Sequence, residues 1–181
     1  PPGDLAAVER KADIVFVGSM DWMPNQDGMK WFLDEVWPLI LKKRPQTTLA
    51  IVGRQPSDEI KSMAGPQVQV TGTVPEVRSW FWGSAISIVP LRIGGGTRLK
   101  IYEAMAAKAP VVSTSIGAEG LEIADGSNIA IADDARAFAE RSLALLDSKD
   151  ARSRMSDTAF EMVATRYSWE SVTSQFERLL Q

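Results

Sequence analysis

The sequence predicts an α/β fold in which an open, parallel sheet of six strands carries helices on both faces. Short apolar, β-rich runs alternate with helical patterns at intervals of roughly 20 residues, which is typical of repeated strand–helix units. The strand runs are apolar throughout, as expected when both faces of a sheet are covered. With 181 residues, 45% of them hydrophobic, the chain is long enough for one domain with its own core.

Each predicted strand is a short run bounded by glycine, proline or polar residues. The first two strands, "ADIVFVG" and "TTLAIVG", both end in glycine, and Gly72 interrupts the third, "VQVTGTV". We expect strands at residues 12–18, 47–53, 68–74, 85–91, 109–114 and 128–132.

The longest helical pattern lies between the first two strands. Its apolar residues recur at helical spacing over residues 26–43, and Asn25 stands where a helix cap is expected. Pro38 has no backbone N–H to donate, so we expect it to kink or split this helix.

Caps and periodicity also predict the remaining helices. Ser57 is the expected cap of a short helix that ends near residue 64, and Pro75 suits the first turn of a helix over residues 75–84. Further helices are expected at residues 97–107, 133–148, 150–167 and 168–180. Four tryptophans on the predicted helices are expected to pack on the sheet: Trp31, Trp37, Trp80 and Trp82.

Composition excludes several classes of function. The net charge is −3 and no basic run is present, so a nucleic-acid partner is not expected. Cysteine and histidine are both absent, which removes disulfides, thiol chemistry and the commonest general base from this chain. No apolar run approaches the roughly 18 residues of a membrane span. We expect residues 1–12 to be a linker or residual N-terminal segment of a longer protein, and residues 13–181 to form one domain.

The loops that follow the strands are where this fold class binds ligands. In open parallel sheets the site lies outside the carboxyl ends of the strands, where the strand order reverses. Three such loops have unusual content: Gly18–Ser19, Gly72–Thr73 and the glycine loop at residues 94–97, "GGGT".

The glycine loop and the helix after it predict an anion site. Glycines let the backbone approach a ligand closely, and the helix start presents unpaired N–H groups and the positive end of its dipole. Arg98 and Lys100 add charge, Thr97 can cap the helix or donate its hydroxyl, and Glu103 is placed to accept ribose hydroxyls. A plain tight turn, with an ordinary Lys100–Glu103 pair, remains the alternative.

The sequence allows two interpretations for each of two other features at this edge. Glu119 and Glu122 follow the fifth predicted strand and are either site residues or plain surface acids. Trp22 and Met23 lie in the loop after the first strand, where we expect them to pack in the core or between domains. The alternative is that they face the missing domain or a lipid-linked acceptor.

The run "VPLRIGGGTRLKIYEAMAAKAPVVSTSIGAEGLE" resembles the nucleotide-sugar signature of the GT-B glycosyltransferases, specifically the large retaining family called GT4 or glycosyl transferases group 1. "FVGSMDWMPNQDGMKWF" resembles the first strand and glycine loop of their C-terminal domain, and "YSWESVTSQF" resembles their C-terminal tail. The resemblance covers about residues 13–180. It implies a Rossmann-like domain that forms the C-terminal, donor-binding half of a two-domain enzyme.

The resemblance also implies roles for single residues, and at some positions this sequence differs from the family pattern. The family pattern has an acid, seven further residues and a second acid, which typically holds the donor's ribose. Glu103 matches the second acid, but Gly95 stands where the first is expected. Ser19 replaces the usual arginine of the first glycine loop, and Asn25 lies near the position of an expected lysine.

These assignments leave Arg98 and Lys100 as the expected catalytic residues that neutralise the diphosphate, with Arg98 preferred. Thr73 and Val74 are expected near the base. The full expected donor-binding set is Gly18, Ser19, Thr73, Val74, Gly94, Gly95, Gly96, Thr97, Arg98, Leu99, Lys100 and Glu103.

The function implied by the resemblance is transfer of a sugar, with retention of configuration, from a UDP- or GDP-linked donor in bacterial polysaccharide or glycolipid synthesis. No cofactor and no metal are expected. The missing N-terminal domain is expected to bind a lipid-linked or glycan acceptor, so this chain alone should be inactive. Its expected location is cytoplasmic, with peripheral attachment to the inner face of the membrane through that domain. Alternatives are another GT-B-like enzyme, of epimerase or phosphorylase type, or a non-catalytic scaffold.

Overall fold

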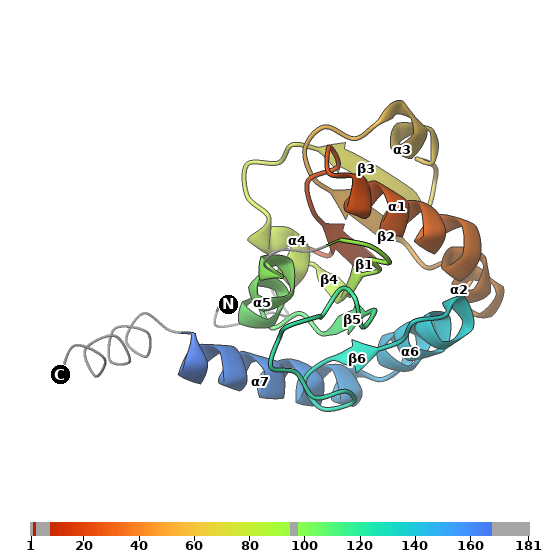
Figure 1. Cartoon of the computed structure of the whole chain (residues 1–181). Helices are drawn as coiled ribbons and strands as arrows, with labels where there is room; N and C mark the ends of the chain where they lie inside the picture. Colours follow the sequence, from red (N-terminus) through yellow and green to blue (C-terminus); the bar gives the residue numbers. More distant parts are fainter. Residues whose placement is uncertain (1, 3–7, 95–97, 168–181) are drawn as a thin grey trace, which may run out of the picture.

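The computed structural model describes residues 2, 8–94 and 98–167, and in them the predicted α/β fold is confirmed. All six strands are parallel and run in the spatial order β3-β2-β1-β4-β5-β6, so the order reverses between β1 and β4 (Figure 1). Each strand lies inside or within one residue of its predicted range. The strands are β1 Ala12–Val17, β2 Leu49–Val52, β3 Val68–Gly72, β4 Ser84–Val89, β5 Val111–Ser113 and β6 Ala130–Ile131.

Helices cover both faces of the sheet. The described helices are α1 Met23–Trp31, the π-helix η2 Phe32–Val36, α2 Trp37–Lys43, α3 Asp58–Ser62, α4 Arg78–Trp82, α5 Leu99–Ala106, α6 Ala135–Asp147 and α7 Lys149–Arg166. Phe16 and Ile88 belong to the core cluster formed with α1, η2, α2 and α6, whereas Val15 and Val111 belong to the cluster formed with α4, α5 and α7. Within the described ranges, no helix combines the length and the apolar character that crossing a membrane requires.

The first helix begins earlier than predicted. It starts at Met23 with Trp22 as N-cap and a proline in its first turn, so the expectation that Asn25 caps the helix was wrong. Pro38 does interrupt the helix. The chain widens into the π-helix η2, in which the Trp37 N–H donates to the Phe32 carbonyl. A proline ring crowds the preceding turn and donates no hydrogen bond, and the wider turn relieves that crowding.

Other boundaries shift for local reasons. Ser57 caps α3 as predicted, since its hydroxyl accepts from the Ile60 N–H. Pro75 is not in the first turn of α4, which begins at Arg78. The Glu76 carboxylate accepts from the Ser79 N–H at 3.1 Å, and this contact starts the helix after the proline. Trp31 and Trp37 are buried, and Trp80 and Trp82 are partly buried against the core, as predicted. The predicted helix at residues 168–180 lies outside the described residues.

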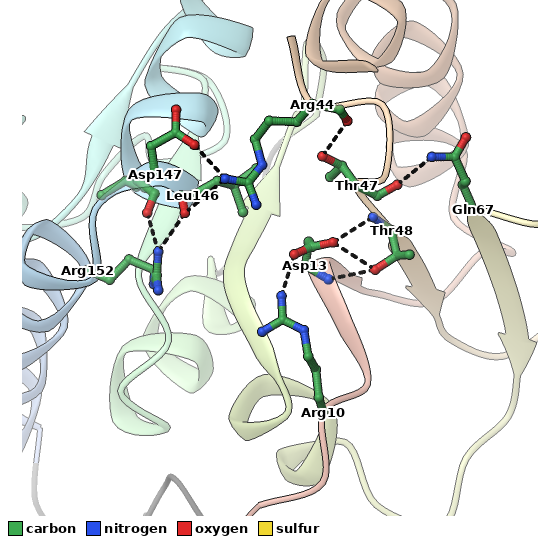
Figure 2. A network of polar contacts seen from close by, with 10 residues as sticks. Arg10, Asp13, Arg44, Thr47, Thr48, Gln67, Leu146, Asp147 and Arg152 are labelled. Carbon is green, nitrogen blue, oxygen red and sulfur yellow. Dashed lines mark hydrogen bonds and ion pairs between the residues drawn. The ribbon is translucent and has the colours of Figure 1, made fainter. Parts of the chain in front are cut away.

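The amino ends of the strands carry a network that ties the sheet to α6 (Figure 2). Arg44 donates to the Asp147 carboxylate at 2.5 Å, and Arg152 donates to the Leu145 and Leu146 carbonyls at 2.6 and 2.9 Å. The last carbonyls of a helix have no partner within it, so Arg152 stabilises the end of α6, and Arg44 joins that end to the segment after α2. Arg44 and Arg152 are therefore engaged in contacts that hold the end of α6.

Candidate functional site

Two glycines allow the loops after β1 and β2 to pack directly against each other at the carboxyl edge of the sheet. A Cβ atom on Gly53 would lie 1.8 Å from the carbonyl oxygen of Gly18, so only glycine fits there. The Gly18 N–H donates to the Val52 carbonyl and the Met20 N–H donates to the Arg54 carbonyl, both at 2.9 Å. The first glycine loop is therefore held in one position.

Helix α1 also packs closely against the loop after β4. A Cβ atom on Gly28 would lie 2.6 Å from the Pro90 carbonyl oxygen. Gly94 has a φ of +116°, and a Cβ there would lie 3.1 Å from the ring of Pro24. The glycine loop thus begins beside α1, at the point where the strand order reverses.

Asn25 bridges the first glycine loop and α5. Its Nδ2 donates to the Ser19 carbonyl at 2.7 Å, and its Oδ1 accepts from the Lys100 Nζ at 2.5 Å. Asn25 is 1% exposed, and a polar side chain so deeply buried needs both partners. The residue that looked like a helix cap is instead a tertiary link between two predicted site segments.

Lys100 lies in the first turn of α5, over the rings of Phe16 and Trp22 at 5.1 and 5.6 Å from Nζ. Burial, and then repulsion by Arg98, lowers the pKa of Lys100 to about 8, while Glu103 opposes that change. An anion beside Nζ would favour the charged form and raise this pKa again. The protonation of Lys100 would therefore depend on whether a phosphate lies beside it.

Arg98 is the N-cap residue of α5 and is 5% exposed. Its Nη2 donates to the Gly94 carbonyl at 3.2 Å and lies 3.3 Å from the Glu119 carboxylate. Its Nε is buried and has no hydrogen-bond partner among the residues that the structure describes. A buried donor without a partner is costly, so this guanidinium has bonding capacity left for an anion.

One cavity of about 510 Å³ brings four of the predicted residues together: Gly18, Ser19, Lys100 and Glu103. Its other lining residues are Val17, Asp21, Trp22, Asn25 and Arg54. Glu103 also lines a neighbouring cavity of about 460 Å³ between α4 and α5. Glu103 is thus a lining residue of both cavities.

Other predicted residues lie elsewhere. Thr73 is exposed and Val74 packs against the core, and neither lines the cavity that contains Lys100. Leu99 is exposed at the start of α5. Gly95, Gly96 and Thr97 lie outside the described residues, so the predicted Thr97 cap does too.

Several site features escaped the sequence analysis. Arg54 and Asp21 line the cavity, and the rule that selected Gly18, the end of a parallel strand, would also have selected Arg54 beside Gly53. Trp22 is 39% and Met23 60% exposed, so packing in the core of this domain is excluded for both. Glu119 contacts Arg98, whereas Glu122 pairs with Arg166 at the surface.

This sheet order, with helices on both faces, defines a Rossmann-like domain of the type found in the C-terminal halves of GT-B enzymes. The model of the glycosyl transferases group 1 family matches residues 11–148. The chain therefore belongs to that family.

Two relatives are each 30% identical to the chain. One is an uncharacterised 44.6 kDa protein in the cps region of Klebsiella pneumoniae, aligned over 172 residues, which are 90% of this chain and 44% of the relative. The other is a phosphatidyl-myo-inositol mannosyltransferase of Mycobacterium leprae, aligned over 173 residues, which are 92% and 45%. The chain spans less than half the length of both relatives.

Solved structures share the fold. A variant of TarM from S. aureus, crystallised with fondaparinux, alpha-GlcNAc-glycerol and UDP, has a TM-score of 0.78 at 21% identity over 94% of this chain and 36% of that one. The C-terminal domain of a group 1 glycosyl transferase from Francisella tularensis has a TM-score of 0.72 at 21% identity over 91% and 90%. HepE of Anabaena, in complex with UDP and glucose, has a TM-score of 0.76 at 13% identity over 97% and 49%.

Proposed function

We propose that this chain is the donor-binding domain of a retaining glycosyltransferase that moves a sugar from a nucleoside diphosphate to an acceptor hydroxyl. The observation that carries the proposal is the convergence of Gly18, Ser19, Lys100 and Glu103 on one cavity where the strand order reverses. Family membership supports transferase chemistry over the epimerase or phosphorylase type. The relatives' printed names, a cps-region protein and a phosphatidyl-myo-inositol mannosyltransferase, favour bacterial polysaccharide or glycolipid synthesis.

The chemistry follows from the charge that the reaction creates. As the bond to the sugar breaks, negative charge grows on the diphosphate, and fixed cations and N–H groups aimed at it lower the barrier. Lys100 and Arg98 would supply the cations, and the start of α5 would supply the N–H groups. Glu103 would accept the ribose hydroxyls. With side-chain cations in that role, we propose that no metal or cofactor is required.

The remaining parts of the enzyme are also proposals. An N-terminal domain would supply the acceptor site, and the exposed Trp22 and Met23 would face it or its acceptor. The division into residues 1–12 and 13–181, the cytoplasmic location and the inactivity of this chain alone remain predictions.

The role of Glu103 is tested by replacing it with glutamine. Titration calorimetry with UDP, GDP and ADP should show that one of these binds, and that Glu103→Gln weakens its affinity by about 10-fold, the loss expected for a hydrogen bond to a charged group. Inorganic pyrophosphate, which has no ribose, should lose no affinity in Glu103→Gln. Glu122→Gln is the matched control, because that carboxylate pairs with Arg166 outside the cavity. If no nucleotide binds the unsubstituted chain, a scaffold is favoured.

Lys100 predicts a pH dependence of nucleotide binding. Its pKa of about 8 means that Nζ is mostly charged at pH 7 and mostly neutral at pH 9. If only the charged form holds the diphosphate, affinity falls about 10-fold as pH rises across that interval. The measurement is calorimetric titration of UDP or GDP, whichever binds. Lys100→Arg should give a flat profile, because a guanidinium stays charged. A profile of unchanged slope in Lys100→Met would contradict the assignment.

A further inference from the structure

The backbone of Arg54 is bonded to the first glycine loop, and the residue lines the cavity that contains Lys100. It follows Gly53 at the carboxyl end of β2, and its carbonyl accepts from the Met20 N–H at 2.9 Å. The next residue, Gln55, turns the chain with a φ of +52°. The position of Arg54 is therefore set by the loops and does not depend on its side chain.

The side chain of Arg54 lies along the first glycine loop. Its Nε donates to the Ser19 Oγ at 2.7 Å, and its Nη2 lies 3.4 Å from the Asp21 Oδ2. The Ser19 hydroxyl in turn donates to the Asp21 Oδ1 at 2.5 Å. This hydrogen bond, more than Arg54, holds the pKa of Asp21 below its usual range. All three residues line the cavity that contains Lys100.

The Arg54–Asp21 pair adds little to the fold. The side chains are 64% and 37% exposed, and exposed ion pairs contribute little to stability. A guanidinium in such a pair exchanges readily between its carboxylate and a better-placed anion. Arg54 can therefore exchange its contact with Asp21 for one with an anionic ligand.

The charge balance of the cavity calls for another cation. Among its described lining residues other than Arg54, Lys100 is the one cation and faces two carboxylates, Asp21 and Glu103, so without Arg54 the side chains would repel a diphosphate. The ammonium of Lys100 is also partly neutralised near pH 8. A guanidinium stays charged throughout this range and can bond two phosphate oxygens at once.

We propose that Arg54 binds the diphosphate of the nucleotide donor and that Asp21 competes with the diphosphate for it. Arg54 is thus a third cation of the donor site, supplied by the loop after β2, and Asp21 sets its availability. The inference rests on the proposed function and deepens it, because it names the residues that tune donor affinity.

Four variants of the 181-residue chain test the pair, titrated with UDP and UMP or with GDP and GMP according to the base that binds. Arg54→Ala should weaken the diphosphate by about 10-fold and the monophosphate by much less. Asp21→Asn should tighten the diphosphate by about 2- to 5-fold, and this gain should shrink in the double variant. Arg141→Ala is the matched control, because Arg141 and Asp125 form a pair of similar exposure outside the cavity.

The outcomes separate this inference from the proposed function. Unchanged diphosphate affinity in Arg54→Ala, with affinity lost in Arg98→Ala, would overturn the role of Arg54 and leave the donor site standing. Weaker binding in Asp21→Asn would overturn the competition, because it would make Asp21 a support for Arg54. Absence of nucleotide binding by the unsubstituted chain would overturn both proposals.

Discussion

Replacing Arg98 by alanine is expected to lower the affinity for a nucleoside diphosphate by about 100-fold, the largest loss among the site variants. Losing one partner of a buried, charged hydrogen bond typically costs 2–5 kcal/mol. Arg98 is buried at the start of α5, and its Nε has no partner among the described residues. Arg98 does not line the cavity that contains Lys100, so the expected loss rests on a phosphate at the start of α5 that supplies the partner this N–H lacks.

The fold should survive this substitution. Arg98 bonds the Gly94 carbonyl and the carboxylate of Glu119, which is largely exposed and can return to water. A melting curve measured beside the titration separates lost binding from lost folding. Arg98→Lys keeps the charge but lacks the planar guanidinium. Its affinity for the diphosphate should lie between that of Arg98→Ala and that of the unsubstituted chain. Full affinity in Arg98→Ala would contradict the role assigned to this residue.

Gly53→Ala is expected to destabilise the domain by roughly 2–3 kcal/mol, measured as the free energy of unfolding in urea. The new Cβ would lie 1.8 Å from the Gly18 carbonyl oxygen, so the ends of β1 and β2 would have to separate. That separation stretches the bond from the Gly18 N–H to the Val52 carbonyl and displaces Ser19 from the cavity wall.

The control for this variant is Gly65→Ala. A Cβ at Gly65 meets no atom within 4 Å, so the substitution should change the free energy of unfolding by less than about 0.5 kcal/mol. Equal stability of the two variants would show that the loops after β1 and β2 do not meet as described. Nucleotide affinity should fall in Gly53→Ala even where the variant remains folded, because Gly18 and Ser19 line the cavity.

The fold could be predicted because its strands are short apolar runs with distinct ends. β1 and β2 each stop at a glycine, and β4 is followed by Pro90, so each strand was found from local signals. Boundaries were less predictable where two local signals compete. Pro75 suits the first turn of a helix, but the Glu76 carboxylate bonds the Ser79 N–H, and α4 begins after both.

The site was predictable only where chain order brings its residues together. Arg98, Lys100 and Glu103 lie along one helix start, so spacing alone connects them. Asn25 is 75 residues from Lys100, and an asparagine next to a helix start looks like a cap whether or not its side chain makes a distant bond. Arg54 reaches Ser19 across 35 residues, because β1 and β2 are neighbours in the sheet.

The most direct test is a crystal structure of the chain with the nucleoside diphosphate that binds it. We expect the diphosphate within hydrogen-bonding distance of Lys100 Nζ and the first N–H groups of α5, with Arg98 beside it and the ribose hydroxyls on Glu103. A diphosphate bound elsewhere, with Arg98 still held only by Gly94 and Glu119, would contradict the assignment of this edge as the donor site.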